Sequence, residues 1–416
     1  MRALSGALRS RNFRLLLACN VTSLTGSAVA LVATPFAVLA VGGSAGDVGY
    51  VATAMLVPVV VFLLLGGVVA DRLPRYRVMV AGDGVQAAAQ ALSAAVVLSG
   101  HGTVWQLLVL AAVRGTGFGF YLPAELGLLP LTVAPEDRAQ ANAINRVGSN
   151  GAQIAGTALG GVAVAALGPG WGLAVDAASF ALAALLRVGM RFTAIPASEP
   201  AGMVRELREG WREFTSRRWL WTIVVQFACV NAVVLAAIDV LGPLVASVHY
   251  GGARSWGFIL AAYSIGSVIG GLAMIRLRPA RMLLAATIVV PLAAPLLFAL
   301  VPPLIVPLVA IAALLAGASF QVFGVNWATT MQQEIPITAL SRVSAYDALG
   351  SLALAPLGTA VAGPLADDFG TSPVLVAGGA LIVVLTAAVL IVPEVRKLRR
   401  HTAPTGAQER ALGDQP

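Results

Sequence analysis

Long apolar runs, separated by short polar connections, fill almost the whole chain. Twelve runs can be drawn along the sequence, at residues 13–40, 47–70, 78–99, 104–130, 140–167, 171–190, 219–247, 255–275, 282–300, 303–331, 343–366 and 372–392. A helix needs roughly 20 mostly apolar residues to cross the hydrocarbon core of a bilayer, and each run is close to that length or longer. The pattern therefore predicts an all-α protein with twelve membrane-spanning helices.

The composition leaves little of the chain for anything other than these helices. Hydrophobic residues make up 58% of the 416 positions and charged residues only 11%, whereas a typical soluble domain has about 25% charged residues. Too few charged side chains remain to cover a water-facing surface. We therefore expect no separate soluble catalytic domain.

One long polar connection divides the helices into six and six. The predicted domains are an N-terminal bundle at 1–190, a cytoplasmic linker at 191–218, a C-terminal bundle at 219–392 and a cytoplasmic tail at 393–416. Apolar and charged side chains alternate at helical spacing inside the linker, with Val204, Leu207, Trp211 and Phe214 opposite Arg205, Arg208, Glu209 and Arg212. This spacing predicts a helix that lies in the membrane interface.

Basic side chains are concentrated on alternate connections. We count Arg187 with the connection that follows the sixth run. All of the 27 Lys and Arg residues then lie on these alternate connections except Arg114 and Arg254. Lys and Arg mark the cytoplasmic loops of membrane proteins, so we expect a multi-pass protein of the cell membrane with both termini in the cytoplasm. The net charge of +8 then reflects topology, and we expect no nucleic-acid partner.

The two halves of the chain are related in sequence. Residues 66–77 align with 270–281 at a constant offset of 204, and Gly156, Gly161 and Gly168 fall on Gly358, Gly363 and Gly370 at an offset of 202. Because six helices separate the matching elements, the repeat keeps its orientation in the membrane. Parallel repeats of this kind are typical of one class of secondary transporter.

Several kinds of chemistry lack the residues they need. The two cysteines, Cys19 and Cys229, both lie in apolar runs, and the three histidines are scattered, so we expect neither a disulfide nor a metal site. A nucleotide-binding P-loop needs a Gly-Lys-Ser/Thr sequence. The only lysine, Lys397, is preceded by Arg396 and followed by Leu398. We therefore expect no cofactor and no ATP-driven mechanism within this chain.

The connection between the second and third helices carries the most specific motif, Gly67-x-x-x-Asp71-Arg72-x-x-Arg75-x-Arg77. With twelve helices in two sixes, it resembles the major facilitator superfamily. Asn12-Phe13-Arg14, Asp83 and Glu209-Gly210 are similar to the twelve-helix drug:proton antiporter branch, which includes macrolide and siderophore exporters. The resemblance implies two bundles related by a pseudo-two-fold axis.

The same resemblance implies that the motif forms a gate. Asp71 would approach the start of the eleventh helix, and Arg72, Arg75 and Arg77 would complete a charge network that closes the cytoplasmic side in one state. The alternative is that these arginines only set the topology. Pro74 and Tyr76 depart from the pattern that the family has here.

The fourth helix carries a polar and aromatic stripe. Arg114, Phe118, Tyr121 and Glu125 follow steps of four, three and four residues and so share one face. Arg114 would lie near the centre of the bilayer, where a charge is costly unless it faces water or a partner. Two interpretations stay open, a role in handling substrate or protons and a structural ion pair with Asp83.

The resemblance implies a central cavity lined by helices 1, 4, 7 and 10. The predicted lining residues are Asn20, Ser23, Ser27, Arg114, Phe118, Tyr121, Gln226, Asn231, Phe320, Phe323 and Trp327. An aromatic wall in the tenth helix suits bulky lipophilic ligands, although such a stripe can also be plain packing.

Four carboxylates within apolar runs are candidates for proton coupling, because burial favours the neutral form of a carboxyl group. They are Asp83, Glu125, Asp176 and Asp239, with Asp83 and Glu125 ranked first. Glu125 and Asp239 lie near helix ends, where each could instead be solvated.

The fifth helix has a face of small residues for close helix packing. Gly156, Gly160 and Gly161 match the antiporter signature G-x-x-x-G-P-x-x-G-G that the resemblance brings, but Thr157 stands in place of the proline and Ala152 in place of the first glycine.

We predict a transporter and not an enzyme, which exports an amphipathic or lipophilic organic compound in exchange for protons by alternating access. Its expected partners are the small-molecule substrate, protons and the lipid bilayer, and we expect a monomer. Two alternatives remain, an importer or uniporter of a small metabolite and a non-transporting membrane sensor with the same fold.

Overall fold

The computed structural model describes residues 5–190, 203–277, 279–301 and 304–398. The described N-terminal half consists of α1 (Ser5–Arg9), α2 (Arg11–Ala40), α3 (Ala45–Arg72), α4 (Arg75–Leu98), α5 (Val104–Leu128), α6 (Arg138–Leu167) and α7 (Pro169–Val188). Short 3-10 turns, η2 (Leu129–Leu131) and η3 (Pro135–Asp137), join α5 to α6.

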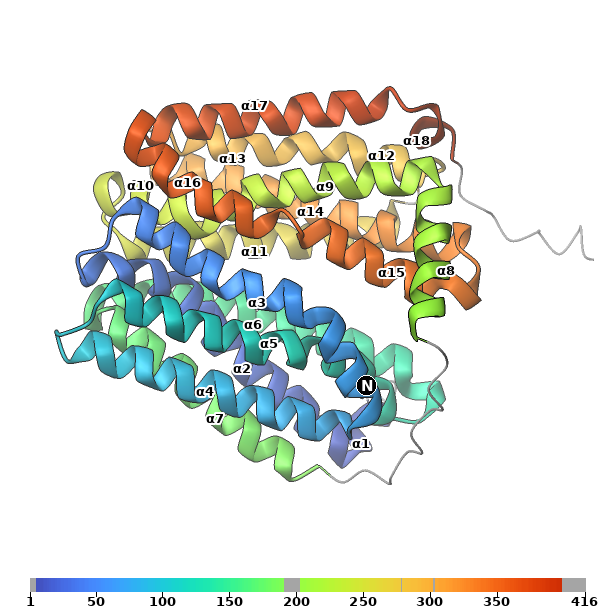
Figure 1. The fold of residues 1–416 in the computed structure, drawn as a ribbon, viewed down its shortest axis with the longest axis horizontal. Helices are drawn as coiled ribbons and strands as arrows, with labels where there is room; N and C mark the ends of the chain where they lie inside the picture. Colours follow the sequence, from blue (N-terminus) through green and yellow to red (C-terminus); the bar gives the residue numbers. More distant parts are fainter. Residues whose placement is uncertain (1–4, 191–202, 278, 302–303, 399–416) are drawn as a thin grey trace, which may run out of the picture.

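The C-terminal half begins after α8 (Met203–Ser216). Its elements are α9 (Arg218–Ala236), η4 (Ala237–Leu241), α10 (Gly242–His249), α11 (Ala253–Arg276), α12 (Met282–Val289), η5 (Val290–Ala293), α13 (Ala294–Ala299), α14 (Val306–Glu334), α15 (Ile337–Leu352), α16 (Ala355–Phe369), α17 (Thr371–Leu390) and α18 (Pro393–Lys397). Figure 1 shows the halves as two stacked bundles, with α8 running across the end where α1 and α18 lie. We call this the termini end and the opposite one the far end.

Eleven spans in the described part of the chain are long and apolar enough to cross a membrane. The remaining predicted span is α4, which has 24 residues and is therefore long enough at about 1.5 Å per residue. Its buried face carries the polar side chains Asp83, Gln86, Gln90 and Ser93, which lowers its overall hydropathy. The all-α prediction with two bundles is confirmed, and the chain is a multi-pass membrane protein.

Three of the spans are interrupted rather than continuous. The seventh contains the π-helical turn η4 between α9 and α10, the ninth contains η5 with Pro291, and the eleventh breaks between α15 and α16, just before Pro356. Proline removes a backbone donor and crowds the preceding turn, which explains the second and third interruptions. Pro243, the second residue of α10, lies two positions after η4, so the same effect accounts for the first interruption.

The linker helix is present, and part of it can be described in detail. α8 packs against α15 and α9, with the Trp211 ring centroid 5.8 Å from that of Phe214 and 5.5 Å from that of Tyr346. Residues 191–202 of the predicted linker and 399–416 of the predicted tail lie outside the described residues. The bounds of the four predicted segments stay predictions.

The internal repeat extends to local geometry. Gly168 and Gly370, which are equivalent in the repeat, have φ values of +90° and +85° at the turns that join α6 to α7 and α16 to α17. A non-glycine residue would be strained at either position. Gly161 and Gly363, also equivalent, both touch backbone of the opposite half, at Ala253 and Ala45 respectively.

The two halves meet at the far end. There α6 packs against α11, and α3 packs against α16. The backbone N–H of Gly46 donates a hydrogen bond of 3.1 Å to the Asp367 carboxylate, and the hydroxyl oxygens of Thr53 and Thr359 lie 2.8 Å apart. These contacts hold the far end shut.

Candidate functional site

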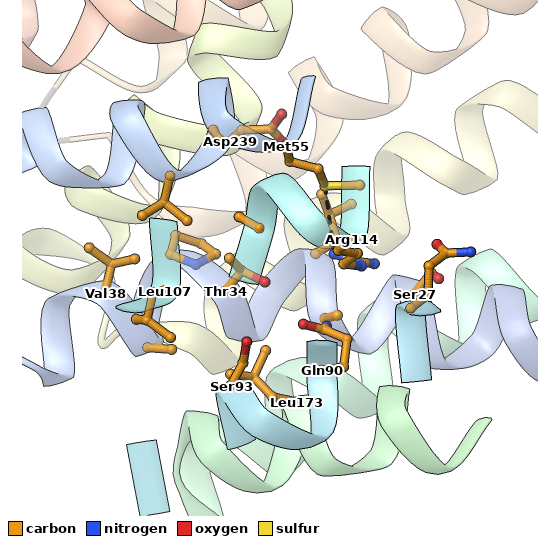
Figure 2. A pocket seen from close by; sticks show the side chains of 18 of the residues that line it. Ser27, Thr34, Val38, Met55, Gln90, Ser93, Leu107, Arg114, Leu173 and Asp239 are labelled. Atoms are coloured by element: carbon orange, nitrogen blue, oxygen red, sulfur yellow. Dashed lines mark hydrogen bonds between the residues drawn. The ribbon is translucent and has the colours of Figure 1, made fainter. Parts of the chain in front are cut away.

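The larger cavity lies inside the N-terminal half. It has a volume of about 340 Å³ and is bounded by α2 to α7 together with one residue of η4. Aliphatic side chains form most of its wall, and its polar lining residues are Ser27, Thr34, Gln86, Gln90, Ser93, Arg114, Gln153 and Asp239. Figure 2 shows Met55 and Asp239 on one side of this cavity and Gln90, Ser93 and Leu173 on the other.

A buried ion pair lies beside the larger cavity. Arg114 on α5 lies 3.2 Å from the carboxylate of Asp176 on α7, and Asp176 is completely buried. Gln90 on α4 donates to the same carboxylate at 2.6 Å, and the Ser27 hydroxyl on α2 does so at 3.4 Å. Side chains from three other helices therefore converge on Asp176, while Arg114 also borders the cavity.

This arrangement corrects the expected partner of Arg114. The structural alternative paired it with Asp83, whereas the structure pairs it with Asp176. Helix direction gives the reason. Both α5 and α7 start at the far end, and at about 1.5 Å per residue Arg114 lies about 15 Å along its helix and Asp176 about 10 Å. Asp83 instead follows the start of α4 at the termini end.

Arg187 is the partner of Asp83, and sequence reasoning had assigned it to a cytoplasmic connection. The structure corrects this, because Arg187 lies in the last turn of α7 and is completely buried. Its guanidinium forms an ion pair with Asp83 and donates to the Tyr121 hydroxyl at 3.2 Å and to Asn20 at 3.4 Å. Proximity to the end of an apolar run had made it resemble a loop residue.

A smaller cavity of about 260 Å³ lies in the C-terminal half. Phe323 on α14 stacks on Phe227 of α9 with ring centroids 4.3 Å apart and lies parallel to Trp327 with centroids 6.0 Å apart. The indole N–H of Trp327 donates to Asp347 at 3.0 Å. Sequence reasoning missed Phe227 and Asp347, because an isolated aromatic or acidic residue in these runs carries no spacing signal.

The predicted lining residues are distributed over these two cavities and the surrounding bundle cores. Ser27, Arg114 and Phe118 border the larger cavity, and Asn231, Phe323 and Trp327 border the smaller one. The others lie outside both linings, namely Asn20, Ser23, Tyr121, Gln226 and Phe320. The polar face of α4 was also missed, although Asp83, Gln86 and Gln90 follow helical steps of three and four that could have revealed it.

The remaining predicted carboxylates occupy different surroundings. Asp239 borders the larger cavity, and Glu125 is partly buried near the end of α5 that faces the termini. Within the described ranges, no group of three His, Cys, Asp or Glu side chains is placed to hold a metal ion. The proton-coupling roles stay predictions.

The gating motif spans the end of α3 and the start of α4. The surroundings of Gly67 and the side chains of Asp71 and Arg72 lie outside the described part. Arg75 donates to the backbone carbonyl of Gly127 at 2.8 Å, which ties α4 to α5, and Arg77 lies against the Tyr76 ring. The gating role of these residues stays a prediction.

The glycine face of α6 contacts two different helices. Gly156 and Gly160 lie against α2, where an added Cβ would come within 2.6 Å of the Thr25 carbonyl oxygen and 2.8 Å of the Val29 Cα. Gly161 faces α11 of the other half, with Ala253 O at 2.8 Å from such an atom. The glycine face of α6 therefore packs against α2 within its own bundle and against α11 at the far end.

Solved structures of transporters share this fold. The nucleoside transporter NupG superposes with a TM-score of 0.72 at 13% identity, over 94% of this chain and all of that chain (100%). A bacterial homologue of the human lysosomal transporter Spinster gives a TM-score of 0.72 at 17% identity, over 95% of this chain and 100% of that one.

Relatives in sequence cover nearly the whole chain. The multidrug efflux pump Tap of Mycobacterium tuberculosis is 29% identical over 418 residues, with 96% of this chain and 97% of that protein aligned. Macrolide efflux protein A of Streptococcus pyogenes is 23% identical over 385 residues, with 90% and 94% aligned.

The model of the transmembrane secretion effector family matches residues 3–410. That match extends from before α2 to beyond α18 and includes every residue that borders either cavity. The chain therefore belongs to the transmembrane secretion effector family of major facilitator transporters.

Proposed function

We propose that this transporter exports an amphipathic or lipophilic organic compound across the cell membrane in exchange for protons, acting as a monomer with both termini in the cytoplasm. The named functions of the relatives, multidrug and macrolide efflux, support export of such compounds. The largely aliphatic cavity with a few polar groups suits an apolar ligand whose orientation is set by a small number of contacts.

The Arg114–Asp176 pair is the observation that carries the proposal. Its guanidinium borders the cavity while its carboxylate is completely buried, so a change in the charge of Asp176 alters the cavity wall directly. Protonation of Asp176 removes the countercharge of Arg114 and leaves a cation at the wall. Loss of the proton restores the pair and neutralises the wall again.

This assignment places proton coupling at Asp176 rather than at Asp83. Asp83 and Arg187 are both completely buried, and neither borders a cavity among the described residues. In this proposal, protons and substrate both reach Arg114 through the larger cavity. A shared binding space is what the exchange of substrate for protons requires. Asp83 then serves mainly to hold α4 against α7.

The direction of opening follows from the contacts between the halves. They meet at the far end through α6 with α11 and α3 with α16. With the termini in the cytoplasm, this arrangement is the state closed toward the outside. Rocking of the halves about the cavity would close the termini end and open the far end.

The experiment is transport by Asp176→Asn in proteoliposomes. Since the amide resembles the protonated carboxyl group, the variant should lose uphill export driven by an imposed pH gradient and keep downhill exchange. Asp368→Asn, which removes an exposed carboxylate, is the matched control. Uphill export by Asp176→Asn at the wild-type rate would overturn its role in coupling, and pH-independent wild-type transport would favour a uniporter.

A further inference from the structure

Among the described residues, one side chain from the C-terminal half borders the larger cavity. All other residues that border it come from α2 to α7, between Leu24 and Leu173, and the exception is Asp239. Asp239 lies on η4, which packs against α2 and α3 of the other half. Both halves therefore contribute to the cavity lining, the C-terminal half through Asp239.

The π-helical turn sets this position. η4 spans Ala237–Leu241, and its other four residues are all buried apolar side chains. π-helical turns inside α-helices occur often at functional sites. Here the turn places one carboxylate at the junction of the halves while the apolar residues around it pack into the protein.

The carboxylate of Asp239 has no polar or ionic partner among the described residues. Among the described residues that border the cavity, the other charged side chain is Arg114, which is paired with Asp176. Because these two charges cancel, the ionised cavity carries one uncompensated negative charge. A charge within the membrane is costly unless it faces water or a partner, so a ligand cation would supply what the protein does not.

We propose that Asp239 binds the cationic group of the substrate, while the aliphatic wall contributed by the N-terminal half holds the apolar body. The ligand is therefore an amphipathic organic cation, such as a protonated amine or an onium ion attached to an apolar scaffold. This inference rests on the proposed function and names the chemical class of its substrate.

The geometry gives such a ligand a mechanical role. Its cationic group is attached to the C-terminal half through η4, and its apolar body is attached to the N-terminal half through residues such as Leu31, Met55 and Leu107. Met55 is flexible and polarisable, and such side chains repack around different shapes. A bound cation thus bridges the two halves at the point about which they move.

The test compares a charged and an uncharged aryl probe on the purified full-length protein in nanodiscs. The probes are tetraphenylphosphonium, a permanent cation, and triphenylphosphine oxide, which is neutral. Asp239→Asn should weaken tetraphenylphosphonium binding by about tenfold or more and leave triphenylphosphine oxide binding nearly unchanged. Asp239→Glu should keep the preference for the cation, and Asp368→Asn is the charge-matched control.

Equal weakening of both probes by Asp239→Asn would overturn the inference, because it would show a structural role. Unchanged tetraphenylphosphonium binding, or a wild-type protein that does not prefer the cation, would overturn it as well. Export of tetraphenylphosphonium from proteoliposomes under an imposed pH gradient tests the proposed function separately. Cation binding that depends on Asp239, without pH-driven export of that cation, would support this inference and refute the proton-driven exporter.

Discussion

At the scale of residues, α7 organises the N-terminal half through two buried charges. Asp176 pairs with Arg114 of α5, and Arg187 pairs with Asp83 of α4. The two α7 residues are eleven positions apart, which is three turns of helix, so they act at different depths. The pair nearer the far end borders the cavity, and the other lies within the packed core at the termini end.

Arg187→Met should destabilise the folded protein strongly. The variant leaves the Asp83 carboxylate buried without its countercharge, which costs about 3–5 kcal/mol for pairs of this kind. Thermal unfolding in detergent measures the effect, with the exposed Arg254→Gln as control. Arg187→Met combined with Asp83→Leu should recover most of the loss, and a double variant no more stable than the single one would contradict the pairing.

At the scale of elements, contact between the halves depends on close approach of helix backbones. Gly161 meets α11 at Ala253, and Gly363 meets α3 at Ala45, so equivalent positions of the repeat close the same end from both sides. The hydroxyl contact between Thr53 and Thr359 lies in this interface. Small residues are what permit such close helix packing in membranes.

Cysteines placed at Thr53 and Thr359 should form a disulfide across the halves. Their hydroxyl oxygens are 2.8 Å apart, so sulfur atoms at these positions fall within bonding reach. In a background without Cys19 and Cys229, oxidation should stop transport almost completely and reduction should restore it. Each single cysteine variant is the control. A pair that cannot be cross-linked would show that this interface does not form in the membrane.

At the scale of the whole molecule, the arrangement separates two tasks between the halves. The described N-terminal half holds both buried ion pairs, while the C-terminal half holds a stack of aromatic rings with one hydrogen-bonded carboxylate. Asp239 is the point at which the second half enters the cavity of the first. Rocking of one rigid half against the other therefore changes the cavity chiefly at that point.

The cross-linked protein should admit water-soluble reagents to the cavity from the termini end. A cysteine at Phe118, which borders the cavity, can be added to the Thr53/Thr359 cysteine pair. After cross-linking, a membrane-impermeant thiol reagent should label residue 118 in inside-out vesicles and not in right-side-out vesicles. Labelling with the reverse preference would contradict either the closed far end or the cytoplasmic placement of the termini.

The helices and their division into two bundles follow from local patterns in the amino-acid sequence. Apolar run length against bilayer thickness is a local property, and so is the spacing that aligns Gly168 with Gly370. The cost of burying charge also marked Arg114, Asp83 and Asp176 as residues that need an explanation. For these features no knowledge of neighbouring helices was required.

How the charges pair, and which of them border a cavity, depends on how the helices pack together. Asp83 and Asp176 carry the same charge within similar apolar runs, and their partners depend on how α4, α5 and α7 pack side by side. Arg187 resembled a loop residue because run length does not fix where a helix ends to within a turn. Asp239 borders the cavity because a π-helical turn meets α2 and α3 of the other half, a contact between segments distant in the chain.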